Sequence, residues 1–462
     1  MRVVVAGYGM AGARVVSELR ARGADVTAFG AETHRPYNRV MLSTLLAGKV
    51  REDDLTLAAP PPGADLRLGV PVTALDLARR VVVTPEGEQA YDALVLATGA
   101  TAVLPPMDGV PAATAHVLRT LDDCRGILAA AGGARSAVVL GGGLLGLEAA
   151  RGLAGCGLAV TVVHAGGHVM DRQLDPDGGH VLARTLRDLG VCVRVGARAT
   201  AWTGDRLLLA DGTAVPGDLL VVACGARPDT ALARAAGLAV HRGVLVDDGL
   251  RTSDPHVYAV GDCAEHDGTV HGLVAPAWEQ AAALADRLTG GTARYRGSRL
   301  VTRLKAGGID LAAMGSVAPD PDAEVVTFAD PARGTYVRLV IRGDRLAGAV
   351  LLGDNPSVGA VTQLYDRDAP VPADRRSLLF GRAFGAEPAA PAASPAFMPD
   401  HAVVCRCNSV PKAAITACWR SGARSVADVA AATRATTGCG GCADAVTGIV
   451  DWLSTVEPEV TV

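Results

Sequence analysis

The residues best equipped for chemistry are four cysteines near the C-terminal end of the chain. They form two close pairs, Cys405-Arg-Cys407 and Cys439-Gly-Gly-Cys442, with 31 residues between the pairs. Such short spacing lets both thiolates of a pair bind one metal centre. The glycines beside Cys439 allow backbone amides to come close to sulfur and stabilise its charge. The pattern predicts a four-cysteine metal site that holds either structural zinc or an iron–sulfur cluster.

The remaining cysteines do not form such pairs. Cys418 falls within a predicted helix, outside the four-cysteine pattern. No secretory segment precedes the first strand, so we expect a reducing, cytoplasmic setting in which disulfides do not form. Five cysteines stand singly among apolar neighbours and are expected to be buried thiols: Cys124, Cys156, Cys192, Cys224 and Cys263.

Two segments repeat one pattern of a short strand, a glycine turn and an amphipathic helix. The first turn is Gly7-Tyr-Gly9-Met-Ala-Gly12 and the second is Gly141-Gly-Gly143-Leu-Leu-Gly146. A dinucleotide-binding βαβ unit has this order, because backbone amides and the helix N-terminus then face a pyrophosphate. The residues expected to line the two dinucleotides are Gly7, Gly9, Met10, Ala11 and Gly12, and Gly141, Gly143, Leu144, Leu145, Gly146 and Glu148.

The two βαβ units differ in the residue at the end of the strand that follows the helix. Glu32 lies twenty residues past Gly12, where a carboxylate accepts the ribose hydroxyls of a dinucleotide. The second unit has His164 at this place, and Arg172 lies too far along the chain to be assigned. An acid there usually selects NADH and an arginine usually selects NADPH. The sequence therefore indicates a nicotinamide dinucleotide without choosing between the two.

Three further motifs follow strands and end in small or acidic residues. They are Ala97-Thr98-Gly99, Cys224-Gly225-Ala-Arg-Pro and Val260-Gly261-Asp262-Cys263. In this order and spacing they resemble the flavoproteins with two dinucleotide-binding domains that are related to glutathione reductase and the bacterial ferredoxin reductases. That resemblance implies FAD on the first unit and NAD(P)H on the second. It also implies flavin-side roles for Arg39, Ser43, Val72, Ala97, Thr98, Gly99, Gly225, Gly261 and Asp262, and a nicotinamide-nucleotide role for His164.

The same resemblance bears on thiol chemistry. Disulfide reductases of this kind carry one or two cysteines in the loop after the first helix, but residues 34–50 contain none. We therefore expect that flavin electrons do not pass to a protein thiol there. No side chain is needed as an acid or base. Lys305 and Glu279 either tune the flavin electrostatically or serve packing alone.

The C-terminal segment resembles the bacterioferritin-associated-ferredoxin type of domain. The resemblance rests on Val404-Cys-Arg-Cys-Asn and on Thr437-Gly-Cys-Gly-Gly-Cys442, and it implies a 2Fe–2S cluster on Cys405, Cys407, Cys439 and Cys442. An Ala/Pro-rich tether joins this segment to a flavoenzyme that otherwise lacks an electron acceptor. Both points favour the cluster over zinc.

The loop around Arg39, the stretch Leu304–Gly315, the segment Leu346–Asp354 and the final domain carry a resemblance that covers the whole chain. They resemble the reductase portion of assimilatory NAD(P)H-nitrite reductase large subunits and the electron-transfer subunits of assimilatory nitrate reductases. The nitrite reductases continue into a sirohaem and 4Fe–4S region. No cysteine follows Cys442, so we expect a reductase half that cannot reduce nitrite alone.

The expected fold class is α/β, with two Rossmann-like dinucleotide-binding domains of the glutathione-reductase type. We expect an FAD domain over residues 1–110 and 238–297 and an NAD(P)H domain over residues 111–237. A small α+β domain with an antiparallel sheet should cover residues 298–376. A linker over 377–399 and a small helical 2Fe–2S domain over 400–462 complete the chain.

The composition limits the classes of partner. A net charge of −4 without a basic block argues against nucleic acid, and the apolar runs are strand-sized, which argues against a membrane. The expected function is transfer of electrons from NAD(P)H through FAD and the cluster to a partner enzyme, an assimilatory nitrate reductase catalytic subunit. Alternatives are a reductase for a nitrite reductase, an oxygenase or a haem enzyme, and a redox-sensing or iron-mobilising binding protein. The oligomeric state, homo-oligomer or hetero-oligomer, stays open.

Overall fold

The computed structural model describes residues 1–110, 114–318, 320–355, 357–380, 395–405, 408, 410–437 and 441–457. These residues form two compact units. The first comprises residues 1–106, 110–130 and 222–298, and the second comprises residues 107–109, 131–221 and 299–462. Residues 111–130 and 222–237, which the sequence assigns to the NAD(P)H domain, thus belong mainly with the first unit.

The first unit is built on a parallel sheet in the order β19-β7-β1-β2-β3. Its strands are β1 (Arg2–Ala6), β2 (Asp25–Gly30), β3 (Asp65–Leu68), β7 (Ala93–Leu96) and β19 (Val257–Ala259). Val3 and Val5 belong to one buried cluster, whereas Val4 and Ala6 belong to another. Because successive strand residues face opposite sides and both sides are covered, β1 is apolar from Val3 to Ala6.

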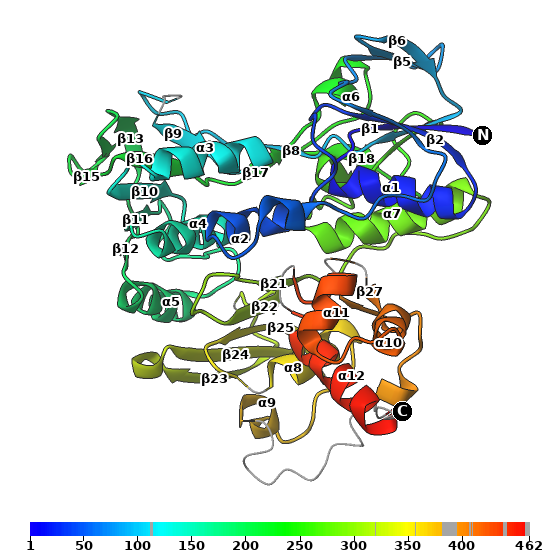
Figure 1. Ribbon diagram of the computed structural model, residues 1–462. Coiled ribbons are helices and arrows are strands. Elements are labelled where there is room, and N and C mark those ends of the chain that lie inside the picture. Colours follow the sequence, from blue (N-terminus) through cyan, green and yellow to red (C-terminus); the bar gives the residue numbers. More distant parts are fainter. Residues whose placement is uncertain are drawn as a thin grey trace. The chain divides into compact units, whose positions relative to one another are not determined.

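Two long helices cover one face of this sheet. Helix α1 (Met10–Ala21) and helix α7 (Val274–Leu288) lie side by side (Figure 1). Leu19 of α1 and Leu284 of α7 are fully buried in the same cluster as Val3 and Val5. This packing fixes the glycine turn that begins α1 against the sheet.

The remaining elements of the first unit are short. The helices are α2 (Leu42–Leu46), α3 (Leu121–Ala131) and α6 (Ala231–Ala235). An antiparallel sheet contains β4 (Ala74–Asp76), β5 (Val81–Thr84) and β6 (Gly87–Ala90). Two strand pairs, β8 (Ala100–Ala102) with β17 (Ala226–Pro228) and β18 (Val244–Val246) with β20 (Ala264–His266), and the short β9 (Ala115–Val117) complete it.

The second unit repeats the dinucleotide-binding pattern. Its parallel strands lie in the order β12-β11-β10-β16, and a three-stranded antiparallel sheet is added to them. The helices are α4 (Leu144–Gly155) and α5 (Pro176–Asp188). The strands are β10 (Ser136–Leu140), β11 (Ala159–Val163), β12 (Val191–Arg194), β13 (Ala199–Trp202), β14 (Arg206–Leu209), β15 (Ala214–Pro216) and β16 (Leu219–Val222).

An antiparallel sheet in the order β21-β22-β25-β24-β23 follows, as the sequence predicts. Its strands are β21 (Val301–Arg303), β22 (Leu311–Gly315), β23 (Glu324–Asp330), β24 (Thr335–Arg342) and β25 (Arg345–Leu352). Helix α8 (Val358–Asp366) packs on β25, and α9 (Arg376–Phe380) follows. Leu339, Leu351 and Val361 are among the buried residues that join sheet and helix.

The C-terminal segment is small and mainly helical. A short pair of strands, β26 (Val403–Cys405) and β27 (Val410–Pro411), precedes α10 (Lys412–Arg420), α11 (Val426–Thr433) and α12 (Ala443–Val456). The N-cap Ser425 and Asp428 form a capping box at the start of α11. Within the described ranges no helix combines the length and apolar character needed to cross a bilayer.

Candidate functional sites

The first glycine turn divides its three glycines between packing and access. A Cβ on Gly7, whose φ is +105°, would lie 2.2 Å from the Ala97 carbonyl oxygen, and one on Gly12 would lie 2.0 Å from the Gly7 oxygen. A Cβ on Gly9 would meet nothing closer than the Arg39 guanidinium at 3.8 Å. The outer glycines therefore let helix and strand approach, and Gly9 keeps the backbone beside the α1 N-terminus open. This cradle, with the amides of Met10 and Ala11 behind it, fits a pyrophosphate.

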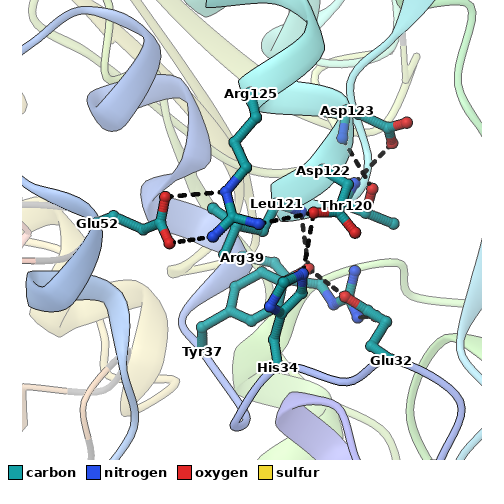
Figure 2. A network of polar contacts seen from close by, with 10 residues as sticks. All are labelled: Glu32, His34, Tyr37, Arg39, Glu52, Thr120, Leu121, Asp122, Asp123 and Arg125. Carbon is teal, nitrogen blue, oxygen red and sulfur yellow. Dashed lines mark hydrogen bonds and ion pairs between the residues drawn. The ribbon is translucent and has the colours of Figure 1, made fainter. Parts of the chain in front are cut away.

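Glu32 lies at the end of β2 in a network of polar contacts (Figure 2). Its Oε2 accepts a 2.7 Å hydrogen bond from the Tyr37 hydroxyl, and its Oε1 pairs with the Arg39 guanidinium. The Tyr37 oxygen in turn accepts from the Leu121 N–H at 2.9 Å. Burial is the main cause that raises the Tyr37 pKa, so Tyr37 stays a neutral donor. Glu32 is about one-third exposed and retains lone pairs that can accept ribose hydroxyls.

The outer part of the same network joins the loop after β2 to helix α3 (Figure 2). The Arg125 side chain bonds both to Glu52 and, at 2.9 Å, to Asp122. His34 Nε2 lies 2.9 Å from the same Asp122 oxygen. Arg39 also donates to the Arg119 carbonyl at 3.2 Å. The loop that carries Arg39 and Ser43 is therefore held in place by contacts from α3.

Asp262 has a partner that the sequence did not reveal. Its Oδ2 accepts a 2.7 Å bond from the Arg119 guanidinium, which also donates to the Ala100 carbonyl at 3.1 Å. The nearest atom to an added Cβ on Gly99 is that same guanidinium, at 4.0 Å. Arg119 therefore lies between the Ala-Thr-Gly turn and the Gly-Asp turn. Its place directly before the α3 N-terminus was the available signal, but 143 residues separate it from Asp262.

The other predicted flavin-side residues lie on several elements of the first unit. The Thr98 hydroxyl donates to the Asp229 carbonyl at 2.7 Å, and the Gly261 N–H donates to Gln280 at 2.7 Å. Ser43 is buried in α2, and Val72 packs against the buried cluster that contains Val4. Gly225 has a φ of +100° and open space around the Cβ position.

The second glycine turn resembles the first in the conformation of its first glycine and in the open space at its middle one. Gly141 has a φ of +121°, and Gly143 has open space where a Cβ would lie. Gly146 is buried in α4, whereas Leu145 is one of the exposed large apolar residues. At the end of β11, His164 Nδ1 accepts the Gly142 N–H at 3.2 Å. This cradle again fits a dinucleotide.

Glu148 on α4 is almost fully buried and pairs with Lys305. Its Oε1 accepts the Lys305 backbone N–H at 3.0 Å, and its Oε2 lies 3.3 Å from the Lys305 ammonium. A buried carboxylate needs such a partner, because removal from water is costly for an unpaired charge. This contact ties the start of the antiparallel domain to the helix that follows the glycine turn. Glu279, the other residue considered for tuning, accepts a hydrogen bond from Ser298.

A second tie joins helix α5 to the antiparallel sheet. Asp175 is the N-cap of α5, and its Oδ1 accepts from the Gly178 N–H at 3.3 Å. Its Oδ2 accepts from the Tyr336 hydroxyl at 2.6 Å and lies 3.1 Å from the Arg338 guanidinium. One carboxylate thus caps a helix of the dinucleotide fold and binds two side chains of β24.

Two of the four paired cysteines lie among the described residues. Cys405 and Cys442 are buried, while Cys407 and Cys439 lie outside the described part of the chain. The Thr436 N–H donates to Cys442 Sγ at 3.2 Å, the kind of bond that stabilises a thiolate. Asn408 Nδ2 donates to the Arg434 carbonyl at 2.6 Å and so joins the loops that carry the two pairs. This donor set fits a cluster held by thiolates, although no three ligands gather within the described residues.

Three of the five single cysteines are less reactive than an ordinary thiol, whereas Cys156 and Cys192 are exposed, so the expectation that all five are buried is wrong for these two. Burial raises the pKa of Cys124 and of Cys224 to about 11, and it also raises the pKa of Cys263.

We expect iodoacetamide at neutral pH to modify the exposed Cys156 and Cys192 in the folded protein. Cys124, Cys224 and Cys263 should react only after unfolding. Peptide mapping by mass spectrometry checks this, and rapid native labelling of Cys124 would contradict it.

Three family matches cover most of the chain. Residues 1–282 match the family described as pyridine nucleotide-disulphide oxidoreductase. The chain belongs to this family. Residues 301–364 match the rubredoxin NAD+ reductase C-terminal domain, and residues 403–452 match the BFD-like 2Fe-2S binding domain. The predicted fold class and family are confirmed, and this NAD(P)H-dependent flavoprotein oxidoreductase binds FAD, NAD(P)H and a 2Fe–2S cluster.

Curated relatives align with nearly the whole of this chain. Nitrite reductase (NAD(P)H) from Bacillus subtilis (strain 168) is 36% identical over 455 residues, covering 96% of this chain and 56% of that protein. The assimilatory nitrate reductase electron transfer subunit of the same organism is 34% identical, covering 99% of this chain and 60% of that protein. The family member described here therefore spans little more than half the length of these relatives.

A solved structure supports the same fold for the reductase part of this family member. The putidaredoxin reductase of its covalent complex with putidaredoxin is 29% identical, with a TM-score of 0.73. The alignment covers 80% of this chain and 94% of that one.

Proposed function

We propose that this chain oxidises NAD(P)H and delivers the electrons to a separate enzyme, an assimilatory nitrate reductase catalytic subunit. One combination of features carries the proposal. Two dinucleotide cradles without a cysteine in the loop over residues 34–50 share a chain with a 2Fe-2S binding domain. The assimilatory nitrate reductase electron transfer subunit of Bacillus subtilis aligns with 99% of this chain.

The chain's own residues would bind and orient the two nucleotides. The cradle around Gly9 would hold the pyrophosphate of FAD, with Glu32 at the ribose and with Arg119 and Asp262 beside the remainder of the flavin nucleotide. The cradle around Gly143 would hold NAD(P)H. Bound FAD supplies the conversion between two-electron hydride transfer and one-electron transfer. The cluster would be held by Cys405, Cys407, Cys439 and Cys442. We also propose the domain boundaries that the sequence analysis predicts.

An anaerobic titration tests the electron-transfer proposal. Purified protein is mixed with NADH or NADPH and then with a one-electron acceptor, and turnover is followed by absorbance. Sustained turnover supports the reductase function, whereas stoichiometric bleaching without turnover supports a redox-sensing protein. Mixing with a molybdenum-containing nitrate reductase tests the partner. Absence of NAD(P)H-driven nitrite formation, under conditions where the artificial acceptor is reduced, would overturn that choice.

A further inference from the structure

The end of β11 lacks the carboxylate that usually binds the adenosine ribose of NADH, and His164 stands there instead. His164 is not directed freely into solvent. Its Nδ1 accepts the Gly142 N–H at 3.2 Å, and its Nε2 lies 3.3 Å from Asp171 Oδ2. Because Nδ1 accepts a hydrogen bond, the neutral ring carries its proton on Nε2, which lies near Asp171 but makes no hydrogen bond within the described residues.

Backbone hydrogen bonds hold the loop over residues 165–171 so that Asp171 lies near the end of β11. The Met170 N–H donates to the Gly142 carbonyl at 2.8 Å, and the Met170 side chain is fully buried. The Gly196 N–H donates to the Gly166 carbonyl at 2.7 Å. Met170 also has a φ of +51°, a left-handed conformation that is uncommon for a residue with a side chain. Gly142 thus anchors both the imidazole and the residue before Asp171.

Gly166 makes room for the pair. An added Cβ there would lie 2.4 Å from Asp171 Oδ2 and 2.7 Å from His164 Nε2. The Asp171 side chain is 41% exposed, whereas that of His164 is 15% exposed. The carboxylate therefore lies beside a mostly buried imidazole and presents oxygen to solvent near the glycine turn.

We propose that Asp171 supplies the ribose carboxylate of the second dinucleotide site and makes the enzyme selective for NADH over NADPH. This specificity rests on the proposed oxidation of NAD(P)H at the same glycine turn. A carboxylate accepts the two ribose hydroxyls of NADH, but it repels the 2′-phosphate of NADPH. His164 stands at the strand end beside that carboxylate, with its Nε2 3.3 Å from Asp171 Oδ2. The exposed Arg172 and Arg194 are the groups that would favour NADPH if Asp171 did not dominate.

Steady-state kinetics with ferricyanide as acceptor test this proposal in the full-length, FAD-loaded protein. The unaltered enzyme should have the higher kcat/KM with NADH. Asp171→Asn should lower that value by roughly tenfold, through KM rather than kcat, as the loss of about 1.4 kcal/mol implies. Its kcat/KM with NADPH should hold or rise. Gly166→Ala, which displaces the pair, should shift selectivity in the same direction.

Asp177→Asn is the matched control, because Asp177 is an exposed carboxylate in the first turn of α5 and has no place in the proposed site. It should leave both kcat/KM values unchanged. Flavin absorbance and thermal unfolding establish that each variant is folded. Preference of the unaltered enzyme for NADPH, or equal losses for both nucleotides in Asp171→Asn, would overturn the proposal.

Calorimetric binding separates this proposal from the proposed function. If the protein fails to turn over with either nucleotide, the function fails, but NAD+ and NADP+ affinities can still be compared. Tighter binding of NAD+, lost in Asp171→Asn, supports the specificity assignment. Equal or reversed affinities would refute it.

Discussion

Lys305→Met is expected to lower the free energy of unfolding by about 3 kcal/mol, the lower end of the range for breaking a buried ion pair. The variant leaves the Glu148 carboxylate buried without the ammonium that lies 3.3 Å from it. The backbone N–H of residue 305 continues to donate to Glu148, which is why the lower end of the range applies. Thermal and urea unfolding, followed by circular dichroism, measure the change.

A double variant distinguishes the loss of the attraction between the two charges from the cost of leaving one buried charge unpaired. Glu148→Gln combined with Lys305→Met should recover most of the stability, because no buried charge then remains unpaired. Arg333→Met is the matched control in the same unit. Its ion pair with Asp330 is formed by an arginine side chain that is 82% exposed, so its loss should change stability by less than about 1 kcal/mol. Equal effects of Lys305→Met and Arg333→Met would contradict the importance of the buried pair.

Cys442→Ser and Cys405→Ser are each expected to abolish electron delivery to a protein acceptor while NADH-dependent ferricyanide reduction continues. Both sulfurs are buried, and Cys442 Sγ already accepts a backbone hydrogen bond. A serine hydroxyl is a poor replacement for a thiolate ligand, so the cluster should be lost. Iron content, acid-labile sulfide and the visible spectrum measure that loss.

Cys418→Ser provides the control from the same segment. Cys418 lies in α10, outside the two cysteine pairs, so iron and sulfide should stay at the level of the unaltered protein. Full cluster content in Cys442→Ser would contradict the ligand assignment. Zinc in place of iron in the unaltered protein would contradict the assignment of a 2Fe–2S cluster to this site.

Local patterns in the sequence predict the fold well. The alternation of strand, glycine turn and helix predicts both dinucleotide folds, because each feature depends on neighbouring residues. An antiparallel sheet follows the second dinucleotide fold, as the sequence predicts. The family assignment is confirmed over residues 1–282, but the roles of individual cofactor-binding residues stay predictions.

Contacts between distant segments could not be predicted in the same way. Arg119 meets Asp262 across 143 residues, and Lys305 meets Glu148 across 157. No local spacing encodes such pairs. Asp171 is a third case. Its carboxylate lies near the strand end because the backbone turns at Met170. Met170 has a left-handed backbone conformation, which a methionine in the sequence does not predict.

The carboxylate of Asp175 has a consequence for how this enzyme can be divided. The family matches place a boundary between residues 282 and 301. Yet Asp175 caps α5 and also binds Tyr336 and Arg338 on the far side of that boundary. A protein truncated after residue 298 would leave this acid exposed beside an uncovered helix. Two family models meet at this boundary, but the second dinucleotide fold and the antiparallel sheet should unfold together as one cooperative element.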